Sequence, residues 1–285
     1  MERLKDKVAI ITGGATGIGE AISKKFALEG AKVIVNGLPE DPVNEVVSEI
    51  TQKGGQAMAY IGNISEPQNA EECVNLAITK FGKLDILINN AGVFPEINEL
   101  QDFSIETFDV LVKNNIKSAF LMTKYALPAL QKTKGCIVSA GSEAGLQGIA
   151  DNTPYGGTKG FIHAFTMGVA AEQARYGIRA NCVCPGPIDT AWTHRETSDM
   201  DFELEKMMIY STAMGRRGTP EEVANVYLFL ASDEASYVTG ALYPVDGGIL
   251  IAKGPMGLKA DNEKQKKPEG QLDTRHSKEG ATSIK

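Results

Sequence analysis

Short apolar runs alternate with amphipathic segments through the first 90 residues of the chain. Residues 8–12 form a continuous apolar run of the kind expected of a strand that is buried on both faces. Apolar residues recur at helical spacing from residue 20, and Gly30 follows the last of them, as at many helix ends. The pattern predicts strands at residues 8–12, 32–36, 57–61 and 84–89, and helices at residues 20–29, 42–53 and 67–81.

The same alternation continues in the second half, where one predicted helix is longer than the others. It covers residues 105–131, and Pro128 is expected to end or bend it. Asn114 and Asn115 lie near its middle, where asparagine is a poor helix former, so each is either a surface residue or has a functional role. The pattern further predicts strands at residues 135–139, 179–184 and 241–244, and helices at residues 155–175 and 220–231.

This order of strands and helices predicts the fold class. Strands that are separated by helices form a parallel sheet, and the helices cover both of its faces. We therefore expect an α/β, Rossmann-like doubly wound sheet of about seven strands in a single domain that spans residues 1–251. Ligands of such sheets bind beyond the carboxyl ends of the strands.

Composition narrows the class of protein. The chain has 285 residues, of which 42% are hydrophobic and 23% are charged, as in ordinary globular proteins. Its net charge of -7 argues against a nucleic-acid surface. No apolar run approaches the roughly 20 residues that a membrane span needs, and the first residues do not resemble a signal peptide. These observations predict a cytoplasmic enzyme that binds neither nucleic acid nor a membrane.

The charge is unevenly distributed, because residues 252–285 form a polar, basic tail. This tail holds eight basic and five acidic residues, or +3, which leaves 21 basic and 31 acidic residues, or -10, before it. A segment with so few apolar residues cannot offset the entropy lost on ordering. We expect the tail to be disordered or to dock on a neighbouring subunit.

The four cysteines lie in apolar, periodic segments: Cys73, Cys136, Cys182 and Cys184. Such cysteines are usually small buried hydrophobic residues, with metal or redox chemistry as the alternative. Cys182 and Cys184, if they lie on one strand, are expected to point to opposite faces. No metal site is predicted.

A glycine-rich turn joins the first predicted strand to the first predicted helix. It reads T-G-x-x-x-G-x-G over residues 12–19. Such a turn leaves backbone N–H groups and the positive helix end open to an anion, and phosphate is the natural occupant. The alternative is a tight turn that needs glycine for its backbone alone.

Tyr155 and Lys159 are four residues apart and therefore lie on one face of a helix. A nearby ammonium group favours the phenolate, but lowering a tyrosine pKa by about three units requires roughly 4 kcal/mol. A low-dielectric pocket with a second positive group could supply that. Ser142 would then hold the substrate oxygen. The alternative is a coincidence on a solvated helix. His163, four residues after Lys159, is interpreted as a packed or interface histidine.

Together these residues resemble the short-chain dehydrogenase/reductase family over residues 5–251. Residues 12–19 are similar to the family's cofactor loop, and residues 89–92 to its signature after the fourth strand. Asn115, Ser142, Tyr155 and Lys159 fall where the catalytic tetrad of the family falls. Pro185 and Gly186, followed by Thr190, resemble the segment that binds the nicotinamide.

The resemblance implies an oxidoreductase that transfers a hydride between NAD or NADP and a secondary alcohol or its carbonyl. Tyr155 would be the general acid or base, and Ser142 would orient the substrate oxygen. Lys159 would lower the tyrosine pKa and hold the ribose, while Asn115 would position a water molecule. The implied cofactor-binding residues are Gly13, Thr16, Gly17, Ile18, Gly19, Asn36, Gly37, Leu38, Asn63, Ile64, Asn90, Ala91, Gly92, Tyr155, Lys159, Pro185, Gly186, Ile188 and Thr190.

Several residues depart from the family pattern. Asn36, Gly37 and Leu38 include no acid of the kind that many NAD-using members carry, and no basic residue lies there to pair with a 2′-phosphate. NAD is favoured over NADP, because a tightly held 2′-phosphate needs a basic partner. Gly156 and Gly157 stand where the family commonly has serine or alanine. They represent either drift at a helix end or extra room beside the nicotinamide or at a helix contact.

Residues 191–217 resemble the family's substrate lid and carry Trp192, His194, Phe202, Met207, Met208 and Tyr210. Arg216 and Arg217 would bind an anionic substrate or form salt bridges. Family members are usually tetramers or dimers, so a homo-oligomer is expected. The alternatives to the alcohol oxidoreductase are a carrier-protein-linked 3-oxoacyl reductase, which would need a basic patch beside the cleft, and a non-catalytic dinucleotide sensor.

Overall fold

The computed structural model describes residues 2–194, 201–261 and 263. Its centre is a seven-stranded sheet in the order β3-β2-β1-β4-β5-β6-β7, and every neighbouring pair is parallel. The predicted fold class is therefore confirmed. The strands are β1 (Val8–Ile11), β2 (Lys32–Gly37), β3 (Gln56–Ile61), β4 (Ile86–Asn89), β5 (Cys136–Ala140), β6 (Arg179–Pro185) and β7 (Leu242–Val245).

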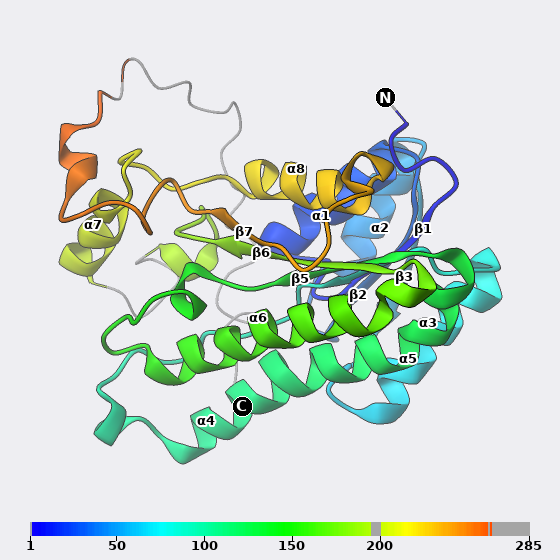
Figure 1. The fold of residues 1–285 in the computed structure, drawn as a ribbon, viewed down its shortest axis with the longest axis horizontal. Helices are drawn as coiled ribbons and strands as arrows, with labels where there is room; N and C mark the ends of the chain where they lie inside the picture. Colours follow the sequence, from blue (N-terminus) through cyan, green and yellow to red (C-terminus); the bar gives the residue numbers. More distant parts are fainter. Residues whose placement is uncertain (1, 195–200, 262, 264–285) are drawn as a thin grey trace.

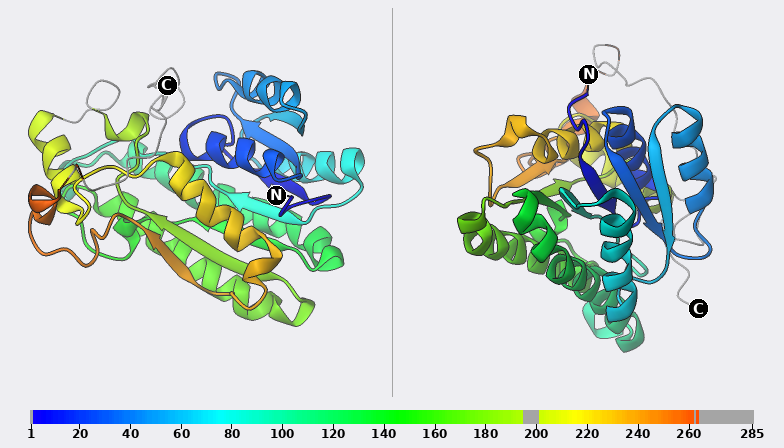
Figure 2. Two further views of the ribbon diagram at one scale, coloured as in Figure 1. Left: turned by 90° about the horizontal axis from the view of Figure 1, so that it is seen from above. Right: turned by 90° about the vertical axis from the view of Figure 1, so that its right-hand side faces the viewer.

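Helices cover both faces of this sheet (Figure 1). On one face lie α1 (Gly17–Leu28), α2 (Val43–Gln52) and α8 (Pro220–Ala231). On the other face lie α3 (Pro67–Phe81), α4 (Ile105–Leu111), α5 (Ser118–Thr133) and α6 (Thr153–Gln173), and Figure 2 shows the same layers from two further sides. This arrangement follows from right-handed crossovers between parallel strands.

Two hydrophobic cores fill the space between the sheet and the helix layers. Phe26, Val46 and Tyr227 belong to the core under α1, α2 and α8. Val74 and Leu130 belong to the core under α3 and α5. Alternate residues of each central strand contribute to opposite cores, which explains why those strands read as unbroken apolar runs.

The strand order places a topological switch point between β1 and β4. The chain leaves β1 toward one face and β4 toward the other, so the connections after these strands diverge beyond their carboxyl ends. Such divergence creates a crevice in doubly wound folds. It is where the sequence motifs of the two strands meet.

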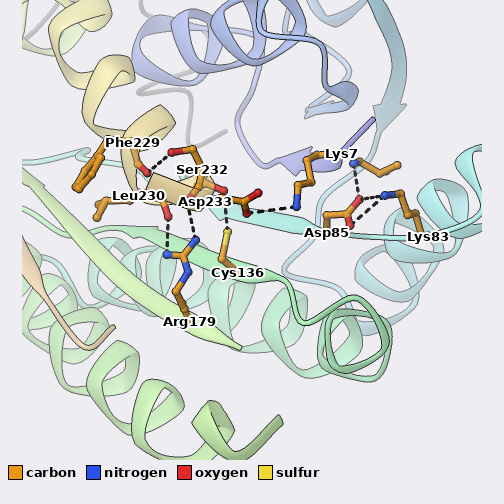
Figure 3. A network of polar contacts seen from close by, with 11 residues as sticks. Lys7, Lys83, Asp85, Cys136, Arg179, Phe229, Leu230, Ser232 and Asp233 are labelled. Carbon is orange, nitrogen blue, oxygen red and sulfur yellow. Dashed lines mark hydrogen bonds and ion pairs between the residues drawn. The ribbon is translucent and has the colours of Figure 1, made fainter. Parts of the chain in front are cut away.

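Polar contacts connect neighbouring segments at the end of the sheet where the strands begin (Figure 3). The carboxylate of Asp85 accepts a hydrogen bond from the Val8 N–H at 2.8 Å and pairs with Lys83 at 2.9 Å. The guanidinium of Arg179 donates to the carbonyl oxygens of Leu230 and Ser232, at 2.8 and 3.1 Å, where α8 ends. The Arg179 contacts stabilise the fold, because they satisfy carbonyl groups at the end of α8.

The long helix predicted at residues 105–131 has an interruption that periodicity did not indicate. α4 and α5 are joined by a π-helical segment, Val112–Lys117. Pro128 lies inside α5, which continues to Thr133. Of the two predicted effects of Pro128, ending the helix was therefore wrong, and bending it stays a prediction. A π-helical segment within an α-helix often marks a functional site, and this one contains Asn115.

The segment predicted to form a lid contains a helix, α7 (Phe202–Ser211). α7 lies beside residues 252–261 at one end of the molecule (Figure 1). In that segment Met256–Lys259 form a 3-10 turn whose Gly257 is buried near Thr212 and Gly215. Residues 195–200, 262 and 264–285 lie outside the described part, so the prediction for the remaining tail stays a prediction. No helix among the described residues has the length and apolar character to cross a membrane.

Candidate active site

A cleft opens at the carboxyl ends of the strands, and the predicted site residues surround it. All of them line this cleft except Gly19 and Asn115, which lie directly behind the lining. The predicted residues in the lining are Gly13, Thr16, Gly17, Ile18, Asn36, Gly37, Leu38, Asn63, Ile64, Asn90, Ala91, Gly92, Ser142, Tyr155, Lys159, Pro185, Gly186, Ile188 and Thr190. Motifs that are spread along the sequence from Gly13 to Thr190 are thus brought to one place.

The glycine-rich turn forms one wall of the cleft, and its glycines are required by geometry. Gly13 has a φ of 57°, in the region that favours glycine. A Cβ on Gly19 would overlap the carbonyl oxygen of Gly13. The turn therefore packs tightly against the start of α1, whose first N–H groups have no partner within the helix. This is the environment that a phosphate requires.

Two polar side chains of the predicted cofactor site hold the backbone in place. Asn90 Nδ2 donates to the carbonyl oxygens of Thr12 and Gly13, both at 3.1 Å. Thr12 Oγ1 in turn accepts the N–H groups of Asn90 and Ala91, at 2.9 and 3.0 Å. These bonds lock the glycine-rich turn to the end of β4. Thr12, buried and at the start of the turn, was not among the predicted site residues.

Asn36 has a comparable role at the other end of the cleft. Its Nδ2 donates to the carbonyl oxygens of Tyr60 and Gly62, at 3.2 and 3.0 Å, so the side chain joins β2 to the segment after β3. Asn63 Oδ1 accepts hydrogen bonds from the Ser65 N–H and hydroxyl, at 3.0 and 2.7 Å. Both asparagines shape the pocket mainly through their backbone bonds.

An acidic residue that sequence reasoning missed lies at this end of the cleft. Asp41 lines it together with Leu38, and its Oδ2 accepts the Leu38 N–H at 2.7 Å. A Cβ on Gly37 would be 2.9 Å from Asp41 Oδ2. Asp41 lies three residues beyond the stretch where an acid was expected, and the chain folds back to bring it there. Among the described lining residues, Lys159 is the basic side chain, and it lies elsewhere in the cleft.

Ser142, Tyr155 and Lys159 meet at the floor of the cleft. Ser142 follows β5, and its Oγ accepts the Ala144 N–H at 3.1 Å. Tyr155 lies in the first turns of α6, and its hydroxyl lies near enough to Ser142 to be influenced by it. Lys159 Nζ lies 5.5 Å from the centroid of the Tyr155 ring and donates to the Ala140 carbonyl oxygen at 3.0 Å.

Burial opposes the charged form of both titratable groups. It raises the pKa of Tyr155, while the hydrogen bond from Ser142 lowers it. Burial also lowers the pKa of Lys159 to about 8. The Tyr155 ring keeps some exposure to the cleft, so a reactant can reach it. Burial therefore disfavours both the Tyr155 phenolate and the Lys159 ammonium, and a ligand bound beside them would change both pKa values.

Asn115 is buried behind this floor, which excludes the surface interpretation of its side chain. The Val93 N–H donates to Asn115 Oδ1 at 2.7 Å, and Asn115 Nδ2 donates to the Val93 carbonyl oxygen at 3.0 Å. The same Nδ2 donates to Thr158 Oγ1 at 3.1 Å. Asn115 therefore joins the chain after β4 to the helix that carries Tyr155. Asn114, its neighbour, lines the cleft.

Asn115 and Lys159 both approach Gly92, which carries no side chain. A Cβ on Gly92 would be 3.2 Å from Asn115 Oδ1 and 3.7 Å from Lys159 Nζ. An acceptor and a donor thus face the same position from two sides. Polar partners on two sides are what an ordered water molecule needs.

The two glycines that depart from the family pattern have different environments. A Cβ on Gly156 would be 2.7 Å from the Ala144 carbonyl oxygen, whereas a Cβ on Gly157 would meet nothing within 4 Å. Gly156 therefore permits close packing of α6 against the 3-10 turn Glu143–Gly145. The interpretation that glycine gives room for a helix contact therefore fits Gly156. No packing contact explains the glycine at position 157.

Aromatic rings gather around Tyr155 and the adjoining part of the cleft. The Phe94 ring lies 4.8 Å from that of Tyr155 and 6.4 Å from that of Trp192. Trp192 lines the cleft, as do its neighbours Ala191 and Thr193. Phe202 and Met207 of α7 are more than half exposed.

The two arginines at the end of the lid segment form internal salt bridges. Arg216 pairs with Glu222 at 2.8 Å, and Arg217 pairs with Glu205 of α7 and also donates to the Thr193 carbonyl oxygen. Arg217 therefore ties α7 to the residues that line the cleft. The salt-bridge interpretation of these arginines is confirmed.

Cys182 and Cys184 are buried on the same face of β6, next to His163. The prediction that they point to opposite faces was wrong, because residues two apart on a strand share a face. His163 is packed, as interpreted from the sequence, and its Nε2 lies 3.4 Å from the Ser142 backbone N.

Comparisons with known proteins agree with this geometry. A family model described as Enoyl-(Acyl carrier protein) reductase matches residues 13–250. The chain is 38% identical to cyclohexanol dehydrogenase of Acinetobacter sp. (strain SE19), covering 86% of this chain and 95% of that protein. It is 36% identical to meso-2,3-butanediol dehydrogenase of Serratia marcescens, covering 88% and 98%. It is also 36% identical to 3-oxoacyl-[acyl-carrier-protein] reductase of Thermotoga maritima, covering 87% and 100%.

Proposed function

The chain belongs to the short-chain dehydrogenase/reductase family and is an NAD(P)-dependent oxidoreductase, and we propose that Tyr155 is the general acid or base of its reaction. The observation that carries this proposal is the convergence of Tyr155, Ser142 and Lys159 at the floor of one cleft. The proposed reaction interconverts a secondary alcohol and a carbonyl. When bound, the nicotinamide supplies or accepts the hydride.

Each polar group at the floor has a task in that reaction. Ser142 Oγ holds the substrate oxygen, and the Tyr155 hydroxyl exchanges a proton with it. Because burial raises the pKa of Tyr155, the phenolate forms only when positive charge is near. The Lys159 ammonium supplies part of that charge, and its position 5.5 Å from the ring supports this role.

Asn115 and Gly92 support a path for the proton to solvent. A water molecule over Gly92 would accept a hydrogen bond from Lys159 Nζ and donate one to Asn115 Oδ1. The side chain of Asn115 is otherwise engaged by Val93 and Thr158, which holds Oδ1 in place. We therefore assign Asn115 a positioning role in the relay.

The residues of the cleft fit a dinucleotide. A side chain at Gly13 or Gly19 would clash with neighbouring backbone atoms, so glycine at both positions lets the turn pack closely, as a pyrophosphate site requires. We propose that NAD is preferred over NADP. The support is Asp41, whose carboxylate lies beside Leu38, because a 2′-phosphate held there would meet negative charge.

The proposed substrate is a small, largely apolar alcohol or ketone. The Phe94 ring next to Tyr155 and the Trp192 ring in the lining of the cleft offer apolar surface, which would exclude water during hydride transfer. Two of the relatives are named for cyclohexanol and meso-2,3-butanediol, which are alcohols of this kind.

A second candidate is reduction of a 3-oxoacyl group on a carrier protein, which the name of the Thermotoga maritima relative favours. An acidic carrier would need a basic surface beside the cleft. The net charge of -10 before residue 252 weighs against it. A non-catalytic sensor would have no use for both Tyr155 and Lys159.

We also propose a homotetrameric, cytoplasmic enzyme. Exposed apolar side chains on α5 and α6, namely Phe120, Phe161 and Met167, support pairing through these helices. The Phe161 and Phe165 rings stack with centroids 5.5 Å apart at this surface. All four cysteines are free, which suits a reducing compartment.

The test is a matrix of two cofactors and several substrates on the purified chain. Cyclohexanol, meso-2,3-butanediol and a 3-oxoacyl thioester would each be offered with NAD and NADP, and the reduced nicotinamide followed by absorbance. If the proposal holds, one of the alcohols should be turned over, and kcat/KM should be higher with NAD than with NADP. Turnover confined to the thioester would favour the second candidate, and no turnover with cofactor binding intact would favour the sensor.

A further inference from the structure

A buried histidine and two buried cysteines form a cluster directly behind the floor of the cleft. His163 lies on α6, one turn after Lys159, and Cys182 and Cys184 lie on β6. Their ligand atoms all lie within 4.8 Å of one another, and Cys184 Sγ is 3.3 Å from His163 Nε2. The three side chains are at most 4% exposed. The proposed reaction uses none of them.

The histidine ring is oriented so that one nitrogen faces the sulfur atoms. His163 Nδ1 lies 3.2 Å from the Gly145 carbonyl oxygen, and since a carbonyl only accepts, Nδ1 carries the proton. Nε2 is then unprotonated, and its lone pair faces Cys184 and the Ser142 N–H. When a histidine binds a metal through one ring nitrogen, its other ring nitrogen usually donates a hydrogen bond, often to a backbone carbonyl oxygen.

Two glycines leave the room that this arrangement needs. A Cβ on Gly141 would overlap His163 Nε2 and lie 2.7 Å from Cys182 Sγ. A Cβ on Gly145 would lie 2.6 Å from His163 Cε1. Gly141 also lines the cleft, so only backbone separates the cluster from the site where ligands enter.

The donor set and its charge select the kind of ion. We propose that His163, Cys182 and Cys184 form a buried, three-coordinate site for a soft monovalent metal ion, Cu(I). Thiolate sulfur is the ligand that Cu(I) prefers, and imidazole suits it too. Ligand atoms about 2.0–2.3 Å from one ion lie roughly 3.5–4.0 Å apart. The separations of up to 4.8 Å would therefore shorten on binding, while the 3.3 Å between Cys184 Sγ and His163 Nε2 would lengthen slightly. Zinc would need a fourth ligand, and the group among the described residues offers three.

The charges balance when the site is filled. Each cysteine that binds gives up its thiol proton to solvent, and no electron is transferred. Two thiolates with one monovalent cation carry a net charge of -1, and Lys159, which interacts electrostatically with both cysteines, offsets it.

Filling the site would also affect the floor of the cleft. His163 Nε2 cannot bind an ion and accept the Ser142 N–H at the same time. Occupancy would therefore release the backbone of Ser142, the residue to which the proposed function assigns the substrate oxygen. Cu(I) would inhibit the enzyme, and this consequence rests on the proposed function, whereas the binding does not.

The direct test is titration of the full chain with Cu(I), without oxygen, against a coloured Cu(I) chelator. We expect one equivalent per chain, and about 100-fold weaker binding in Cys182→Ala and in Cys184→Ala. The double variant Cys73→Ala/Cys136→Ala is the matched control, because both of its cysteines are buried elsewhere, and it should bind as the wild type does. No uptake against the chelator, or affinity unchanged in the Cys182 and Cys184 variants, would overturn the proposal.

X-ray absorption on the copper-loaded wild type keeps the test independent of how the variants fold. Two sulfur atoms and one nitrogen around the copper are expected, and any other set contradicts the proposed site. Cofactor binding and thermal unfolding of each variant report whether it is folded. Because these measurements do not use turnover, they can fail or succeed separately from the proposed catalytic function.

Discussion

Asn115 and Val93 exchange two hydrogen bonds, one from the Val93 N–H to Oδ1 at 2.7 Å and one from Nδ2 to the Val93 carbonyl oxygen at 3.0 Å. A side chain thus imitates a strand partner for the chain that leaves β4. The π-helical segment Val112–Lys117 places Asn115 where it can do this. Both Asn115 Oδ1 and Lys159 Nζ then lie close to Gly92.

Replacing Gly92 by alanine should obstruct the proposed relay. A Cβ 3.2 Å from Asn115 Oδ1 and 3.7 Å from Lys159 Nζ would crowd the proposed bridging water molecule, so we expect turnover to fall about tenfold, which corresponds to the loss of one hydrogen bond of roughly 1.4 kcal/mol. Steady-state kinetics and a KM for NAD would measure it. Gly148→Ala is the control, because its Cβ meets nothing within 4 Å. Equal turnover in the two variants would argue against the relay.

Lys159 should make the stability of the protein depend on pH in a defined direction. Its pKa in the folded protein is about 8, below the ordinary 10.5, so the folded state loses its proton first as the pH rises. The free energy of unfolding should therefore rise between pH 8 and 10.5, by about 3 kcal/mol. Lys159→Met should lack this rise. Urea unfolding of both proteins across the range would measure it, and parallel pH curves would contradict the assignment.

Asp41 should discriminate against NADP. Asp41→Asn removes the negative charge beside Leu38 while keeping the shape, so the ratio of NAD to NADP efficiency should fall about tenfold. Parallel measurements of kcat/KM with both cofactors would show it. Glu40→Gln, which removes a neighbouring charge outside the lining of the cleft, is the matched control.

Leu38→Arg should shift the preference further toward NADP, because a guanidinium would meet the 2′-phosphate. The double variant Asp41→Asn/Leu38→Arg should prefer NADP more strongly than either single variant does. Unchanged cofactor ratios in all three would place the adenosine elsewhere in the cleft.

Alanine substitutions at Gly156 and Gly157 should change the free energy of unfolding in opposite directions. Gly157→Ala adds a better helix former to α6 at a position with open space, so it should stabilise the protein by up to about 1 kcal/mol. Gly156→Ala forces a Cβ toward the Ala144 carbonyl oxygen at 2.7 Å and should destabilise it and lower turnover. Thermal and denaturant unfolding would compare them. A stabilising Gly156→Ala would show that the contact has room to relax.

The sequence predicted the fold well, because strands buried on both faces and helices with one apolar face leave distinct periodic signals. The unbroken apolar run around Ile10 and the turn at Gly13 are local features, so they could be read directly. The cleft followed from them, since motifs at the carboxyl ends of parallel strands must meet.

Other features depend on contacts between distant residues, for which the sequence carries no local signal. Asp41 reaches the cleft only because the chain after β2 folds back, and the π-helical turn at Asn115 depends on its bonds to Val93 and Thr158. The cluster of His163 with the two cysteines of β6 needed only the correct strand periodicity to locate both sulfur atoms on one face.

The most direct test of the account is the turnover of Tyr155→Phe, measured beside its affinity for NAD. The change removes one hydroxyl and leaves the ring contact with Phe94, so NAD binding and stability should stay near those of the wild type. Loss of general acid–base catalysis should lower turnover by about 10²–10⁴-fold or more. Near-normal turnover with NAD bound would contradict the assignment of Tyr155 as the group that moves the proton.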